Sequence, residues 1–217
     1  MKKFYAVLVM VFLLQGLYAQ VKFRVAMLPD EKTFEVYLRP DTTWNAPFNY
    51  TPSSQLALRV PTGGFSPGTV TSKKGQWSNN AFVVAPVEAP GYDYLAFALS
   101  SPTSDITYTD GQEVLLFTFT NNGTCTGQMN FIDNKNDPFL PPNSQNVNIG
   151  NQISVAAAGP GVNAYYGPYT VGGNDCSSSI SGDCGFHTMA LNLRLLQPVV
   201  QEMPALLFMR PPLWVYL

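Results

Sequence analysis

The sequence is poor in the residues that most catalytic and metal centres require. It contains one histidine, His187, which lies in a C-terminal region unlike the rest of the chain. A serine or cysteine nucleophile in the main domain would therefore lack a histidine as its general base. The three cysteines also lack the CxxC spacing of structural zinc sites. The sequence thus predicts a protein that is not an enzyme and has no resident cofactor.

Charged residues are scarce as well. They make up 12% of the chain, with 12 basic and 14 acidic side chains and a net charge of −2. Nucleic-acid-binding proteins normally carry a basic face, and Lys73-Lys74 is the only basic pair beyond the N-terminal region. Apolar runs are too short for a membrane span, which needs about 20 residues. Neither a nucleic-acid partner nor a membrane span is expected.

The first 19 residues have the features of a secretory signal peptide. Met1-Lys2-Lys3 gives a basic start, residues 4–14 are apolar throughout, and Ala19 is a small residue before Gln20. We expect the mature chain to begin near Gln20 and to be secreted, acting in the extracellular space or at the cell surface.

Export would place the cysteines in an oxidising compartment, where disulfides persist. Cys125 follows a strong strand pattern, whereas Cys176 and Cys184 lie in a Gly/Ser-rich stretch. We predict a Cys125–Cys176 bridge, which would tie the end of the domain to its body. A local Cys176–Cys184 bridge is the alternative, because sequence alone does not give connectivity.

Between residues 20 and 157 the apolar residues repeat with a period of two. The alternation is clear in residues 21–26, 34–39 and 55–60, while residues 92–99 and 114–119 are more continuously apolar. Such patterns are typical of half-buried and central strands, respectively. Gly-, Pro- and Asn-rich turns separate them, and weaker strands are expected at 128–132, 146–149 and 152–157. The prediction is an all-β, antiparallel β-sandwich of about eight or nine strands.

The chain changes character after this domain. Residues 158–185 are rich in Gly, Ser and Tyr and are expected to form an irregular arm or linker. Residues 186–217 form an apolar tail interrupted by proline. The tail is interpreted as an aberrant or disordered end, with a short amphipathic segment that packs on a partner as the alternative.

Several short motifs carry a resemblance to a known family. They are Val60-Pro61-Thr62-Gly63-Gly64-Phe65, Ala89-Pro90-Gly91-Tyr92-Asp93-Tyr94, Gln112-Glu113-Val114-Leu115-Leu116-Phe117, Asn122-Gly123-Thr124-Cys125, and residues 137–144. In this order of turns and strands the chain resembles the cohesin-like modules of large secreted bacterial proteins. The resemblance implies a nine-stranded, jelly-roll-like sandwich related to carbohydrate-binding modules. In true cohesins a sheet face docks a dockerin helix pair, but the motifs here do not map that face.

Aromatic side chains in turn-rich segments are the main candidates for ligand contact. Trp44, Trp77 and Tyr92 are predicted to bind a ligand, because rings offer large apolar faces to sugars. Tyr50 and the cluster Tyr165, Tyr166 and Tyr169 could serve in the same way. The alternative is that these rings anchor loops over the edge of the core.

Two acidic features allow weaker alternatives. Asp133-Asn134-Lys135-Asn136-Asp137 is an oxygen-rich loop of a kind that calcium favours, but Lys135 occupies a ligand position of the EF-hand pattern. A solvated turn is the preferred interpretation. Paired carboxylates could make a glycosidase, and the available acids at turns and strand ends are Asp93, Asp105, Asp110 and Glu113.

Together these features predict a secreted, non-catalytic binding module that contacts an extracellular protein or polysaccharide at the cell surface. A structural or adhesion spacer from a larger surface protein is the second hypothesis, and a carbohydrate-active enzyme is a much weaker third.

Overall fold

The computed structural model describes residues 20–169 and residue 175, and these residues form an all-β structure. Within this part of the chain there are ten strands and one short 3-10 helix, against the eight or nine strands predicted. They are β1 (Val21–Met27), β2 (Thr33–Pro40), β3 (Ser53–Pro61), β4 (Pro67–Ser72), β5 (Trp77–Val83), β6 (Tyr92–Leu99), β7 (Val114–Asn121), β8 (Asn130–Phe131), β9 (Gln152–Ser154), η1 (Ala156–Ala158) and β10 (Tyr165–Pro168).

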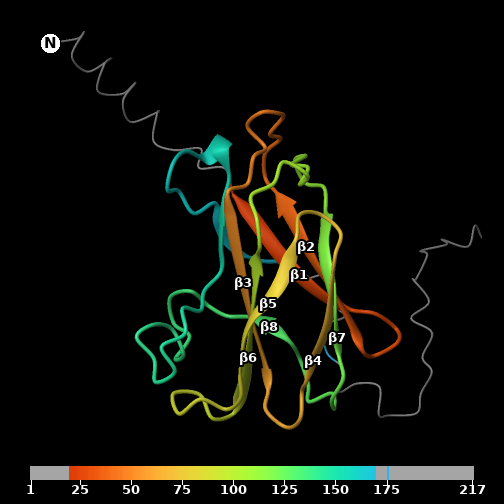
Figure 1. Cartoon of the computed structure of the whole chain (residues 1–217), viewed down its shortest axis with the longest axis vertical. Coiled ribbons are helices and arrows are strands. Elements are labelled where there is room, and N and C mark those ends of the chain that lie inside the picture. Colours follow the sequence, from red (N-terminus) through yellow and green to blue (C-terminus); the bar gives the residue numbers. More distant parts are fainter. Residues whose placement is uncertain (1–19, 170–174, 176–217) are drawn as a thin grey trace, which may run out of the picture. The chain divides into compact units, whose positions relative to one another are not determined.

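The strands form two sheets (Figure 1). The first has the order β10-β1-β2-β7-β4, and the second has the order β5-β6-β3-β8, with β9 pairing with the beginning of β3. All strand pairs are antiparallel except β1 and β10, which run parallel at the edge of the first sheet. The predicted antiparallel β-sandwich is therefore confirmed, with one parallel pair at its edge.

The main core fills the space between the sheets. In β1, β2 and β3 the alternation read from the sequence places one set of side chains inward, and those side chains are buried. At the centre Phe97 of β6 packs against Phe117 and Phe119 of β7, with ring centroids 5.0 and 4.7 Å away. Burying large aromatic and aliphatic side chains in this way is the dominant favourable contribution to folding.

A second, smaller core lies on the outer face of the second sheet. Ala57 of β3 and Tyr94 of β6 point away from the main core and are covered by Ile132, Phe139 and Ile149. These covering residues belong to the long segment 132–151, which runs beside β3 and β6 in Figure 1. Both faces of β6 are thus buried, as its continuous apolar composition predicts.

Three strands were not predicted. β4 and β5 are edge strands with many exposed polar residues, so they lack the apolar alternation that marks a half-buried strand. β10 lies where the sequence predicts an irregular arm, and that prediction is wrong for residues 165–168 because they pair with β1. Conversely, residues 146–149 form no strand and belong to the covering segment.

Two of the glycine-containing turn motifs meet in space. The Thr124 backbone N–H donates to the Gly64 carbonyl at 2.9 Å, and the Asn122 N–H donates to Ser66 at 2.8 Å. Gly64 has a φ of 117°, which glycine adopts readily, and a Cβ on Gly123 would collide with the Gly64 carbonyl oxygen. The turn before β4 and the turn after β7 therefore interlock, and only glycine fits between them.

Several sequence predictions fall on residues outside the described part of the chain. These are the signal peptide at 1–19, Cys176, Cys184, and the tail at 186–217. Cys125 is disulfide-bonded, and both of its possible partners lie outside the described residues, so the pairing stays a prediction. In residues 20–169 no helix is long and apolar enough to cross a membrane.

Candidate functional site

The three aromatic residues predicted to bind a ligand lie in different surroundings. Trp77 is 5% exposed, its ring lies 5.0 Å from Phe117, and its indole N–H donates to the Lys74 carbonyl at 2.8 Å. The exposure expected from its turn-rich neighbourhood is not found, because β5 turns the indole into the core. This geometry favours the alternative of an anchoring ring.

Trp44 and Tyr92 are more accessible but do not form one surface. Trp44 is partly buried and lies against Tyr108, with 5.0 Å between ring centroids. Tyr92 is 37% exposed and carries the Arg59 guanidinium 4.6 Å from its ring centroid. Among the described residues, neither ring is in contact with the other or with Trp77.

Three of the four candidate catalytic acids have hydrogen-bond or ionic partners of their own. Glu113 accepts two hydrogen bonds from Arg24 at 2.9 and 2.7 Å, and Asp105 lies 3.5 Å from Lys74. Asp93 is buried and accepts the Ala85 backbone N–H at 3.1 Å, whereas Asp110 is exposed.

The oxygen-rich loop at 133–137 directs its side chains to separate partners. The Asp137 carboxylate is bound by Arg59 at 2.8 Å, and the Asn134 amide pairs with the backbone of Asn151. Within the part of the chain that the structure describes, no three His, Cys, Asp or Glu side chains gather as a metal site would require. The loop geometry therefore favours the predicted turn over a calcium site.

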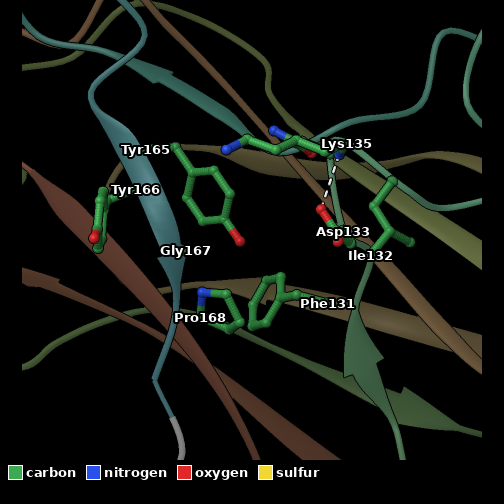
Figure 2. A pocket seen from close by; sticks show the side chains of 9 residues that line it. Phe131, Ile132, Asp133, Lys135, Tyr165, Tyr166, Gly167 and Pro168 are labelled. Atoms are coloured by element: carbon green, nitrogen blue, oxygen red, sulfur yellow. Dashed lines mark hydrogen bonds between the residues drawn. The ribbon is translucent and has the colours of Figure 1, made fainter.

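A cleft of about 520 Å³ opens where the edges of the two sheets approach each other (Figure 2). One wall is β10 of the first sheet, and the other is the chain that leaves β8 of the second sheet. The lining residues used below are Phe131, Asp133, Lys135, Tyr165, Tyr166 and Pro168. Its volume lies within the range of about 300–1,000 Å³ that is common for small-molecule sites.

Tyr165 is held rigidly in this cleft. Its ring stacks on Phe23 of the core with 5.1 Å between centroids, and its backbone N–H donates to the Asn163 side chain at 3.0 Å. The same Asn163 oxygen accepts the N–H of Ile153 at 3.1 Å, which joins β9 to the beginning of β10. The position of the ring is thus set by the core and by backbone hydrogen bonds.

The hydroxyl group of Tyr165 is a polar group of the cleft that lacks a hydrogen bond within the described part of the chain. Its oxygen is buried without a hydrogen bond among the described residues, and Figure 2 shows it pointing into the cleft. A buried hydroxyl without a partner costs roughly 1–3 kcal/mol. Buried polar atoms nearly always have a partner in folded proteins, so this hydroxyl is a candidate for contact with a bound group.

The opposite wall is also rigid. One oxygen of Asp133 accepts the Lys135 backbone N–H at 2.8 Å, and the other accepts the Asn136 side-chain amide at 2.6 Å. Asn134 fixes the same turn, because its side chain donates to the Asn151 carbonyl at 2.6 Å and accepts the Asn151 N–H at 2.8 Å. Asp133 itself stays exposed at the mouth of the cleft.

The two walls differ in their protonation behaviour. Burial raises the pKa of the Tyr165 phenol well above its usual range, and the negative charge of Asp133 raises it further. The backbone N–H of Lys135 lowers the pKa of the Asp133 carboxyl below its usual value. At neutral pH the cleft therefore presents a neutral hydroxyl that can donate and a carboxylate that can only accept.

Sequence reasoning identified both walls but not the cleft. The sequence marked the tyrosine cluster as a candidate for ligand contact and residues 133–137 as an oxygen-rich loop, about 30 residues apart. No motif indicated that the two sheets bring them together. Asn163, which positions Tyr165, carried no signal in the sequence.

No family model matches the chain, and neither a curated protein nor a solved structure matches it with statistical significance. The likeness to cohesin-like modules therefore stays a prediction from the turn motifs, and the site is assessed on its own geometry.

Proposed function

We propose that this chain is a secreted, non-catalytic binding module that contacts a protein or a carbohydrate at the cell surface through the cleft between β10 and β8. The observation that carries the proposal is the Tyr165 hydroxyl, which has no partner among residues 20–169, is fixed by the core and points into the cleft. The cohesin-like turn motifs favour the same class of function, since modules of that family bind rather than react.

Binding is favoured over catalysis by the composition of the cleft. Among the described residues that line it, Asp133 carries the one carboxylate, and both of its oxygens already accept hydrogen bonds from its own turn. Glycoside hydrolysis needs a second carboxyl group about 5–10 Å away, and none of the four candidate acids lines the cleft. A rigid site that combines a hydroxyl donor, a carboxylate and the Lys135 side chain on apolar walls suits recognition.

The test is retention of the purified, exported chain on insoluble polysaccharides and on extracts of surface proteins. We expect specific retention that Asp133→Ser reduces, because serine can still cap the turn but removes the carboxylate from the cleft. Asp105→Ser is the matched control, since Asp105 is also an exposed acid that caps a backbone N–H, outside the cleft. N-terminal sequencing of the exported chain checks that it begins near Gln20.

Three results would count against this proposal. If Asp133→Ser and Asp105→Ser were retained equally well, the binding site would have to lie outside the cleft. Turnover of any polysaccharide, measured as released reducing sugar, would contradict a non-catalytic module. Failure to retain any ligand, together with self-association, would favour the spacer hypothesis.

A further inference from the structure

We infer that the cleft binds an uncharged sugar ring, with the Tyr165 hydroxyl as a fixed hydrogen-bond donor and the Asp133 carboxylate as a fixed acceptor. This inference rests on the proposed function, because it names the class of ligand for the same site. It selects the carbohydrate over the protein partner.

The first step is the hydrogen-bonding capacity of Tyr165. A phenol has one O–H donor and an acceptor oxygen, and this one uses neither on the described protein. The ring cannot turn away to find a partner, since it is stacked on Phe23 and its backbone is held by Asn163. A bound group must therefore come to the hydroxyl and accept its proton.

The second step is the capacity of Asp133. A carboxylate has about four acceptor positions, and the two hydrogen bonds from Lys135 and Asn136 occupy one on each oxygen. The remaining positions need a donor from the ligand. Asp133 and Tyr165 line the same cleft from its two walls, so one ligand in the cleft can reach both.

The third step is the kind of group that satisfies both walls. A sugar hydroxyl donates and accepts at once, so neighbouring hydroxyls on one ring can accept from Tyr165 and donate to Asp133. A carboxylate or phosphate only accepts, so it can satisfy the Tyr165 hydroxyl but leaves the free acceptor positions of Asp133 unfilled. A peptide backbone would have to place a C=O group at Tyr165 and a separate N–H group at Asp133, whereas any two neighbouring sugar hydroxyls can serve both.

The fourth step is the apolar part of the cleft. Phe131 and Pro168 lie together below the Tyr165 hydroxyl in Figure 2. Exposed Pro168, with a smaller contribution from the largely buried Phe131, offers carbon surface to the C–H face of a ring whose hydroxyls point toward Tyr165 and Asp133. Sites for small molecules commonly combine apolar walls with a few fixed polar groups in this way.

The experiment compares Tyr165→Phe with Tyr37→Phe in the full exported chain. Neutral oligosaccharides of glucose, xylose and mannose are titrated by calorimetry, with oligogalacturonates as charged probes. We expect Tyr165→Phe to weaken binding of a neutral oligosaccharide about 3–10-fold, the effect of one lost hydrogen bond. The melting temperature should stay constant or rise, because the variant removes a buried hydroxyl that has no partner.

Tyr37→Phe serves as the matched control. The Tyr37 hydroxyl donates to Glu35 at 2.6 Å on the outer face of the first sheet, so its loss should leave sugar affinity unchanged without raising the melting temperature. Weaker sugar binding without any loss of stability in Tyr165→Phe is the signature of a ligand-directed group. If Tyr165 had only a structural role, Tyr165→Phe would lower the melting temperature and leave the sugar affinity unchanged.

The outcomes separate the inference from the proposed function. Unchanged affinity of Tyr165→Phe for a neutral oligosaccharide would overturn the inference, as would stronger binding of the oligogalacturonates. Retention of a surface protein that Asp133→Ser reduces, with no oligosaccharide bound, would overturn the inference and leave the proposed function standing. Absence of any ligand would overturn both.

Discussion

At the scale of single residues, the tyrosine hydroxyls show how burial and partners distinguish structure from function. The Tyr94 hydroxyl donates to Asp137 at 2.9 Å, and that of Tyr108 lies 2.7 Å from the Thr51 hydroxyl. Both are satisfied and stabilise the sandwich. The Tyr165 hydroxyl is equally well held by its surroundings but has no partner among the described residues, and unlike Tyr94 and Tyr108 its residue lines the cleft, which is why we propose it as a ligand contact.

The Arg24–Glu113 pair predicts a pH dependence at the same scale. Hydrogen bonds from Arg24 lower the pKa of Glu113 below its ordinary value of 4.5. Between the two pKa values the unfolded chain binds more protons than the folded one, so stability rises with pH. The contribution is complete above about pH 4.5 and is lost as the pH falls through the folded pKa.

Glu113→Gln should therefore lower the free energy of unfolding by about 0.5–1 kcal/mol at pH 7, the range of a well-oriented surface pair. Below pH 4 the difference from the unaltered chain should shrink. The measurement is the melting temperature from pH 7 to pH 3, with Glu31→Gln in the exposed β1–β2 turn as the control. A difference that stays constant over this range would contradict the assignment.

At the scale of elements, one ionic cluster fastens the segment 132–151 to the second sheet. The Asp137 carboxylate has no exposed surface, and it binds the Arg59 guanidinium, the Tyr94 hydroxyl and the Phe139 backbone N–H. The segment contains one wall of the cleft, so this cluster also supports the site. Through Arg59 of β3 and Tyr94 of β6, the cluster holds a segment that has no regular secondary structure of its own in a fixed position.

Asp137→Ala should lower the free energy of unfolding by about 2–4 kcal/mol, because it leaves Arg59 and Tyr94 without their partner. Asp105→Ala, which breaks an exposed pair with Lys74, should cost at most about 0.5 kcal/mol. Urea denaturation of both variants measures the difference. Equal midpoints would show that the cluster does not fasten the segment.

At the scale of the whole molecule, the sequence predicted the two packed sheets and their core better than the strands at the sheet edges. The alternation in residues such as Phe23 and Leu58 follows from burial on one face, so the sandwich and its core could be read directly. The polar strands β4 and β5 and the parallel strand β10 depend on neighbours distant in the sequence, and no local pattern marks them. The cleft was missed for the same reason, since Asp133 and Tyr165 come to line one cleft only through the pairing of strands distant in the sequence.

The most direct test of the cleft as the binding site is an NMR titration of the exported chain with the neutral oligosaccharide that it binds most tightly. The account predicts that the largest amide shifts occur at residues 131–135 and 165–167, on the two walls of the cleft. Shifts concentrated around Trp44 or Tyr92, with the cleft residues unchanged, would contradict it.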